Sequence, residues 1–308
     1  MNSKMHISVS PHIHSGRSTQ RIMLDVILAL LPTTVAGAVI FGWRSLAVVA
    51  VCVASCILFE MLFNLAVKKE QTVGDLSAAV TGLLLALNLP ANIALWQAVV
   101  GSAFAIVIVK CLFGGIGKNL VNPAITARVF MIVSFGAMAK AAYPVADTVS
   151  GATPLVMISE GTVPSLLDLF LGKHGGMIGE VSALALIIGG AYLLIRRVIT
   201  WHIPAVFIGG VFVFTFLFNG FDALGALAAV LSGGLLLGAI FMATDYVTSP
   251  CTAWGKVIFA VGAAIITVLI RIWGTYPEGV SFAILLMNIL SPYIEAWTPR
   301  RLFGGKKA

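Results

Sequence analysis

Residues 21–42, RIMLDVILALLPTTVAGAVIFG, form an apolar run in which Arg21 and Asp25 are the only charged side chains. A helix of this length spans about 33 Å, which is enough to cross the hydrocarbon core of a bilayer. Similar runs recur along the chain, which is 59% hydrophobic and 10% charged, with a mean hydropathy of +1.04. These values lie far outside the range of soluble domains. The sequence therefore predicts an all-α integral membrane protein.

The apolar runs predict about ten transmembrane helices. Barrel strands are not indicated, because they would appear as shorter segments of alternating hydrophobicity. The expected spans are residues 21–42, 45–67, 75–89, 93–112, 122–139, 177–196, 203–219, 222–243, 256–273 and 278–295. These spans divide the chain into an N-terminal segment 1–20, five helices in 21–139, a loop 140–176, five helices in 177–295 and a basic tail 296–308.

The distribution of basic residues predicts the orientation in the membrane. If the N-terminus lies in the cytoplasm, fifteen basic residues fall on the cytoplasmic side and four, Arg44, Lys140, Lys173 and Arg271, fall outside. This excess follows the positive-inside rule. The first twenty residues also contain no apolar core of a signal peptide. Both termini are therefore expected in the cytoplasm, and loop 140–176 on the extracytoplasmic side.

The two halves of the chain show weak self-similarity. The tetrapeptide GLLL occurs at 82–85 and again at 234–237. In both halves a basic residue, Lys110 or Arg271, is followed by an aromatic residue, a glycine and a new helix. Two sets of five helices separated by a long loop would have opposite orientations, as in transporters built from inverted repeats.

Two of the expected spans carry helix-breaking residues. Span 75–89 is expected to break near residues 88–90, and span 222–243 near residues 244–245. Irregular backbone at membrane depth must line a protected cavity, because lipid cannot satisfy its polar groups. We therefore expect discontinuous helices at the interface between the two halves.

Several functional classes are not supported. FGGIGKN at 113–119 lacks the upstream glycine and the following Ser or Thr of a nucleotide-binding loop. The four cysteines lack metal-ligand spacing and are interpreted as small hydrophobic residues, and the five histidines are placed unsuitably for haem ligation. The net charge of +7 is spread between the spans, so no nucleic-acid partner is expected.

Asn119 and Asn122 follow a glycine-rich segment, 114–117. Asn122 directly precedes Pro123, an arrangement typical of a helix start with a capping side chain. The glycines would let the backbone approach a planar or anionic ligand, and the two side-chain amides could pair with its carbonyl and imide groups. The alternative is a glycine-rich turn between two helices.

Two acidic residues lie in or beside the expected spans. Glu60 precedes Lys68 by eight residues, so it lies roughly 12 Å inside the helix end. Such a residue either belongs to an ion path or pairs with a buried base such as Arg128. Asp245, in MATDYVTSP at 242–250, belongs either to a cation or cofactor site or to a polar turn that ends a helix.

Residues 147–153, DTVSGAT, form a short polar segment among apolar runs. Gly151 permits unrestricted backbone angles and leaves the Thr153 hydroxyl accessible at the edge of the loop. The residue spacing alone is equally typical of a surface turn in which Thr153 caps a helix before Pro154.

The pattern Asp-x-x-Ser-Gly-Ala-Thr resembles the flavinylation motif at which a dedicated transferase esterifies the phosphate of FMN to the threonine hydroxyl. The chain as a whole resembles the D subunit of the Rnf electron-transport complex, a relative of the B subunit of the sodium-pumping NADH:quinone reductase. The matching segments are residues 10–12, 21–32, 114–124, 244–250 and 276–288.

The resemblance implies specific cofactor sites. Thr153 would carry covalent FMN, and Lys140 or Lys173 could offset the charge of the phosphodiester. A second, non-covalent flavin such as riboflavin would bind near Asn119 and Asn122. The transferase would recognise a turn formed by Asp147, Ser150, Gly151 and Ala152.

The resemblance also implies a fold similar to urea and ammonium transporters, in a bacterial or archaeal cytoplasmic membrane. The partners would be the A, B, C, E and G subunits of the Rnf complex, membrane lipid and the FMN transferase. The complex would move electrons between ferredoxin and NAD⁺ and couple this to Na⁺ or H⁺ translocation. The chain alone is not expected to be catalytic, because it has neither a nucleotide fold nor cluster-ligand cysteines. The alternatives are a flavin-free transporter or channel, and a component of a related complex that reduces a redox-sensing transcription factor.

Overall fold

The computed structural model describes residues 18–135, 153–159, 164–274 and 278–299. This part of the chain is helical and contains no β-strand. The predicted all-α architecture is therefore confirmed. The expected N-terminal segment and basic tail lie almost wholly outside the described residues.

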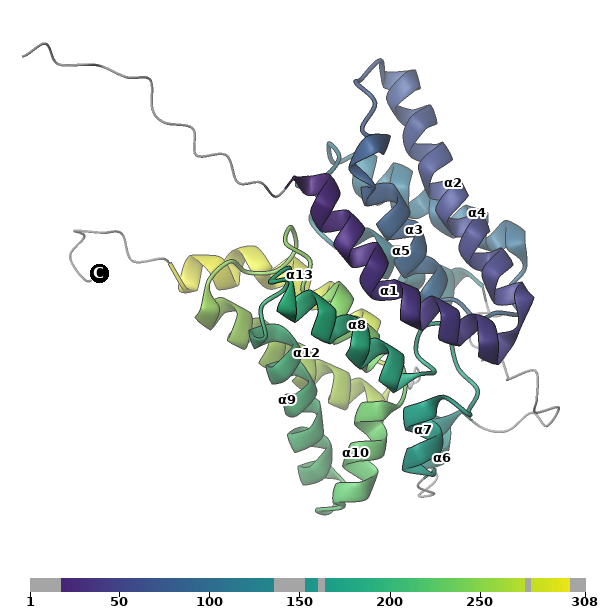
Figure 1. Ribbon diagram of the computed structural model, residues 1–308. Helices are drawn as coiled ribbons and strands as arrows, with labels where there is room; N and C mark the ends of the chain where they lie inside the picture. The colour runs from purple at the N-terminus through teal and green to yellow at the C-terminus, as the bar shows by residue number, and fades with distance from the viewer. Residues whose placement is uncertain (1–17, 136–152, 160–163, 275–277, 300–308) are drawn as a thin grey trace, which may run out of the picture.

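The helices follow one another as Figure 1 shows. The first half contains α1 (Thr19–Phe41), α2 (Trp43–Val67), the 3-10 helix η1 (Val73–Asp75), α3 (Ser77–Leu87), α4 (Leu95–Ala103), the π-helix η2 (Phe104–Cys111) and α5 (Pro123–Ser134). The connecting region contains α6 (Pro154–Ser159) and α7 (Leu166–Leu171). The second half contains α8 (Ala183–Ile195), α9 (His202–Phe218), α10 (Ala223–Leu231), α11 (Leu235–Leu237), the π-helix η4 (Gly238–Met242), α12 (Ala253–Trp273) and α13 (Val280–Trp297).

Four of the described helices, α1, α2, α12 and α13, are long and apolar enough to cross a membrane. Helix α10 and the segment Leu235–Met242 form a fifth candidate, bent by 64°. The five expected spans that remain coincide with shorter apolar helices of 10–17 residues, namely Ser77–Leu87, Leu95–Cys111, Pro123–Ser134, Ala183–Ile195 and His202–Phe218.

The two sets of helices meet along α1 and α8, which lie side by side in Figure 1. Within the first set α2 packs against α3 and α4, and within the second α9 packs against α12 and α10. Small residues allow the close approach: a Cβ added to Gly189 of α8 would lie 2.2 Å from the Ala29 carbonyl oxygen of α1. Helix–helix contacts in membranes are commonly built in this way, because no hydrophobic force drives them.

The second discontinuous span ends its helix at Met242, close to the predicted break at 244–245, and contains a further break, which was not predicted, at residues 232–234. Gly233 there has a φ of +66°. A Cβ on Gly234 would lie 3.2 Å from Glu278 Oε1 and 3.3 Å from Arg128 Nη1. The helix is therefore interrupted where glycines let the backbone approach charged side chains closely. The two GLLL segments are not equivalent, because the first lies inside α3 and the second directly follows this break.

The first discontinuous span ends its helix at Leu87, close to the predicted break. The segment before α8, predicted as helical from residue 177, is irregular up to Ser182. Its amides satisfy backbone carbonyls around the end of α3: Ile178 N–H donates to Leu89 O at 3.1 Å, and Gly179 N–H donates to Leu87 O at 2.7 Å. Carbonyls at a helix end need such partners when water is excluded.

Two further boundaries differ from the prediction. Helix α5 ends at Ser134 and not near residue 139, because Phe135 has an extended backbone conformation. The loop expected over 140–176 contains the short helices α6 and α7, which pack beside α10. Both are six residues long, which is too short for an apolar periodicity to reveal them.

All six tryptophans are exposed at helix ends, with side chains between 59% and 81% accessible. Trp43, Trp96 and Trp273 lie at one end of the bundle, and Trp201, Trp254 and Trp297 lie at the other. Helix α12 carries Trp254 at its start and Trp273 at its end, roughly 28 Å apart along the axis. Tryptophans concentrate at the two membrane–water interfaces. Their placement is that expected of helices that cross a bilayer.

Candidate functional site

A cleft opens at the end of the bundle where α1, α3 and α5 begin and α8 and η4 end. It encloses about 820 Å³ of unoccupied space, counting its open mouth. By the positive-inside prediction, this end of the bundle faces the cytoplasm.

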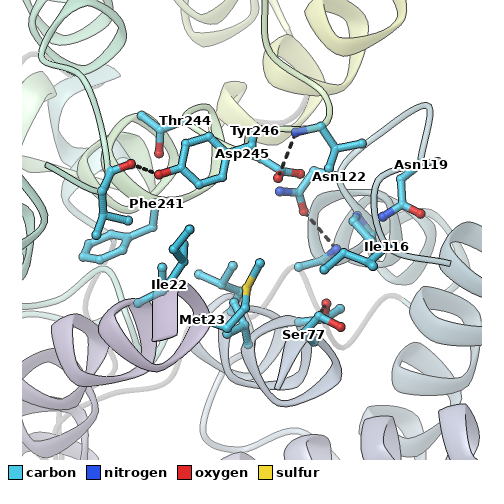
Figure 2. Close-up of a pocket in the computed structure, with 18 of the residues that line it drawn as sticks. Ile22, Met23, Ser77, Ile116, Asn119, Asn122, Phe241, Thr244, Asp245 and Tyr246 are labelled. Carbon is cyan, nitrogen blue, oxygen red and sulfur yellow. Dashed lines mark hydrogen bonds between the residues drawn. The ribbon is translucent and has the colours of Figure 1, made fainter. Parts of the chain in front are cut away.

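The cleft combines one apolar wall with one polar wall, as Figure 2 shows. Ile22 and Met23 of α1 face Asn122 and Asp245 across it. Asn119 also lines the cleft. The structure therefore brings together three of the predicted site residues, which come from both halves of the chain.

Asn122 caps α5, so the predicted helix start at Pro123 is confirmed. Its side-chain oxygen accepts hydrogen bonds from Ala124 N–H at 3.0 Å and Ile125 N–H at 3.3 Å. Its side-chain nitrogen donates to the Met242 carbonyl at 3.4 Å. Asn122 thus joins the start of α5 to the π-helix η4 of the other half and fixes the floor of the cleft.

Asn119 is a residue of the polar wall whose hydrogen bonding is incomplete. It is half-buried, and its Oδ1 is buried without a hydrogen-bond partner in the described part of the chain. A buried acceptor left unpaired costs about 1–3 kcal/mol. The preceding Gly114, Gly115 and Gly117 have φ values of +116°, +97° and +84°, so this loop needs glycine to hold its shape. The Asn119 side chain therefore carries an acceptor that no described residue satisfies.

Asp245 meets one of the two descriptions that the sequence left open, and its part in a cation or cofactor site stays a prediction. It forms a polar turn, because its carboxylate accepts from Val247 N–H at 3.4 Å and from Thr248 Oγ1 at 3.3 Å. The same half-buried side chain lines the cleft. Burial raises the pKa of the Asp245 carboxyl above its ordinary value. The Tyr246 hydroxyl, which donates to the Val198 carbonyl, ties this turn to the end of α8.

Glu60 pairs with Lys110 and not with Arg128. Lys110 Nζ lies 3.0 Å and 2.9 Å from the two Glu60 carboxylate oxygens and 2.6 Å from Ser77 Oγ. Thr72 Oγ1 also donates to Glu60, at 2.7 Å. The prediction that Glu60 pairs with a buried base is confirmed, but the base is Lys110 and not Arg128. The reason is that helix η2, and not α5, lies beside Glu60 on α2.

Arg128 belongs to a second buried cluster, at the junction of the two halves. It forms ion pairs with Glu180 and Glu278 and donates to the Asn88 side chain. Arg271 lies beside it and donates to the carbonyls of Ala229 at 2.6 Å and Ser232 at 3.2 Å, at the end of α10. Glu180 and Glu278 were not among the predicted site residues, although a charged residue within an apolar span is a signal of a functional or structural role.

Lys110, Arg128 and Arg271 were counted among the charges that set the orientation. All three lie on helices and have buried partners, so their positions do not indicate which side of the membrane the adjoining loops face. Without them, thirteen basic residues remain on the predicted cytoplasmic side and three on the other. The predicted orientation is unchanged.

Thr153 is half-buried and directly precedes α6. Its carbonyl accepts a hydrogen bond from Met157 N–H at 3.0 Å, so it stands at the start of a helix. Helix α6 reaches the break in the second discontinuous span, since Leu155 lies against Gly233. Lys173 is exposed. The remaining predicted motif residues, Asp147, Ser150, Gly151 and Ala152, and also Lys140, lie outside the described residues.

Residues 6–304 match the NQR2, RnfD, RnfE family. The chain belongs to this family. The predicted resemblance is thereby confirmed over nearly the whole length of the chain.

Curated relatives of the chain are D subunits of membrane complexes. The D subunit of the Na⁺-translocating ferredoxin:NAD⁺ oxidoreductase complex of Acetobacterium woodii is 49% identical over 308 residues, which cover 98% of this chain and 96% of the relative. The D subunit of the proton-translocating complex of Clostridium ljungdahlii is 38% identical over 319 residues, with coverages of 98% and 96%. The D subunit of an ion-translocating oxidoreductase complex of Stutzerimonas stutzeri is 40% identical over 328 residues, with coverages of 93% and 92%.

Proposed function

We propose that the chain is the membrane-embedded D subunit of an ion-translocating ferredoxin:NAD⁺ oxidoreductase. The observation that carries this proposal is the 49% identity to such a protein across 98% of the chain. In this role the chain holds flavins that relay electrons, and other Rnf subunits contact ferredoxin and NAD⁺. The complex couples this transfer to movement of Na⁺ or H⁺ across the cytoplasmic membrane.

The proposed topology has ten spans in two inverted five-helix repeats, like urea and ammonium transporters. The packing supports it: α2 contacts α3 and α4 in the first set, as α9 contacts α10 and α12 in the second. Each set also contains an interrupted span, α3 in the first and α10 with Leu235–Met242 in the second. The tryptophans at both ends of the second set support membrane crossing by that set.

Thr153 is the proposed site of covalent FMN on the extracytoplasmic side. Support comes from the complete DTVSGAT motif, with Asp147, Ser150, Gly151 and Ala152 as the recognition turn for the transferase. A phosphodiester to Thr153 would keep the carrier on an open face of the membrane, and the bound flavin would supply redox chemistry that side chains lack.

The cleft is the proposed site of the second, non-covalent flavin. Its support is that Asn119 and Asn122 both line the cleft, where a side-chain amide could pair with the carbonyl and imide groups of the ring. Lys110 is the one cation among the described residues of the cleft wall, and beside it lie the acidic groups of Glu60, of Asp245 and of Asp75, which accepts a hydrogen bond from Ser77, so no net positive charge is left for a phosphate. A flavin without phosphate, such as riboflavin, suits this cleft better than FMN does.

Glu60 and Asp245 are the proposed ion-path residues. Asp245 lines the cleft. Both Glu60 oxygens contact the Lys110 ammonium, so a cation would reach Glu60 only by displacing that group.

The test of the redox function is covalent flavinylation. The chain is coexpressed with an FMN transferase, denatured and viewed under ultraviolet light on a gel. We expect a fluorescent band that Thr153→Val abolishes, and mass spectrometry of the peptide containing Thr153 should show added FMN. A band that never fluoresces despite an active transferase would favour the flavin-free transporter or channel.

A further inference from the structure

Lys110 is the only cationic side chain among the described residues that line the cleft. Its side chain is 2% exposed, and that of its partner Glu60 is 3% exposed. Glu60 is not one of the residues that form the cleft wall. The Lys110 ammonium donates to Ser77, which also lines the cleft, so the ion pair is oriented with its positive end nearer the cleft and its negative end behind it.

The local backbone turns Lys110 inward. Lys110 lies in the π-helix η2, where Leu112 N–H donates to the carbonyl of Val107, five residues earlier, at 3.0 Å. Short π segments inside α-helices are rare and occur frequently at functional sites. An apolar pair of similar size in place of Lys110 and Glu60 would often be as stable as the buried ions. Stability alone therefore does not explain why the chain buries both charges beside a cleft.

The ammonium group is held in a fixed position. It donates to both Glu60 oxygens and to Ser77 Oγ, and Glu60 receives a further hydrogen bond from Thr72. These partners occupy the three N–H donors of Lys110. The group therefore acts on a ligand through its charge and not through a new hydrogen bond. A preorganised charge of this kind needs no rearrangement when charge develops nearby, and it acts strongly where water is excluded.

We propose that the Lys110–Glu60 pair is an oriented dipole that stabilises the reduced flavin in the cleft, with Glu60 as the residue that positions Lys110. The inference rests on the proposed cleft flavin. On reduction that flavin takes up two electrons, supplied by the ferredoxin side of the complex, and one proton from water, and so gains one negative charge. The Lys110 ammonium favours this charged form over the neutral oxidised form.

The test uses the full-length chain purified in detergent, with Thr153→Val to exclude covalent FMN, and loaded with riboflavin. The midpoint potential is measured by spectroelectrochemical titration at fixed pH. The main variant is Lys110→Met with Glu60→Gln, which removes the dipole and leaves no unpaired buried charge. We expect its equilibrium constant for two-electron reduction to fall at least tenfold, which corresponds to a midpoint about 30 mV lower.

Two further variants complete the test. Lys110→Arg keeps the positive charge, so its equilibrium constant for two-electron reduction should stay within about threefold of that of the parent chain. Lys118→Met removes an exposed lysine outside the cleft wall and should leave the midpoint unchanged. An unchanged midpoint in the double variant, with riboflavin still bound, would overturn the role of the pair. If the parent chain binds no riboflavin, the cleft flavin itself is refuted, and the role of the pair with it.

Discussion

Arg128 of α5 and Glu180, in the irregular segment before α8, form a buried ion pair with Nη2 and Oε1 3.2 Å apart. The pair connects the two halves of the chain, and Glu278 at the start of α13 joins it. Gly234 passes so close that a Cβ would lie 3.3 Å from Arg128 Nη1. The break in the second discontinuous span, the junction of the halves and this ionic cluster therefore form one structural unit.

Loss of Arg128 is expected to destabilise the folded chain strongly. Arg128→Met would leave the buried Glu180 and half-buried Glu278 carboxylates without their ion-pair partner, at a cost of about 3–5 kcal/mol. Thermal unfolding in detergent measures the effect. The control is Arg196→Met, which breaks an ion pair with Asp25 whose arginine is 57% exposed and should cost about 0–1 kcal/mol. Equal losses in the two variants would contradict a stabilising role of the cluster.

Asn119 is expected to matter for ligand binding more than for folding. Asn119→Leu removes an acceptor that has no partner, so the melting temperature should not fall, whereas riboflavin should bind about tenfold more weakly. Quenching of riboflavin fluorescence measures the affinity. Asn122→Ala is the comparison, because it removes the cap of α5 and should cost about 1 kcal/mol of stability. Unchanged riboflavin affinity in Asn119→Leu would argue against this contact.

Asp245 is expected to make the stability of the folded chain depend on pH. Burial raises its pKa in the folded chain above the ordinary value of 3.8. The folded state therefore binds this proton more tightly than the unfolded state, and its contribution to stability is lost as pH rises through the folded pKa. Asp245→Asn should be more stable than the parent chain at neutral pH, and the difference in melting temperature should shrink as the solution is acidified. A difference that grows on acidification would show that the sign is wrong.

The contact between α1 and α8 is expected to depend on Gly189. In Gly189→Ala the new Cβ would lie 2.2 Å from the Ala29 carbonyl oxygen, so the helices must separate at a cost of about 1–3 kcal/mol. Gly209→Ala in α9 is the matched control, because no atom lies within 4 Å of the new Cβ there. That variant should be as stable as the parent chain or slightly more stable. Melting curves of the two variants that coincide would refute the close contact.

Substitution of Glu60 is expected to impair ion coupling more than cofactor attachment. Glu60→Gln should reduce Na⁺ or H⁺ uptake by proteoliposomes that contain the intact complex, because it changes a buried charge beside the cleft. Flavin attachment at Thr153, read as fluorescence on a denaturing gel, should change little. Equal loss of uptake and fluorescence would indicate a folding role for Glu60 instead.

Local sequence features determined the helices and the family. Apolar runs located the described helices that coincide with the expected spans, with boundaries that differ by up to six residues, because crossing a bilayer requires a minimum apolar length wherever the helix packs. The start of α5 at Pro123 was also readable, since a capping asparagine followed by proline acts within one turn. The family followed from short motifs in a fixed order, and it was confirmed over residues 6–304.

Only the tertiary structure decided which charges meet. Lys110 lies fifty positions from Glu60, and Arg128 lies fifty-two from Glu180, so no local pattern connects them. Their pairing depends on how far each helix is rotated about its axis, on the π turn before Leu112 and on the glycine break at 232–234. Hydrophobic periodicity cannot fix such rotations, because helices that face lipid on one side and protein on the other are apolar on both.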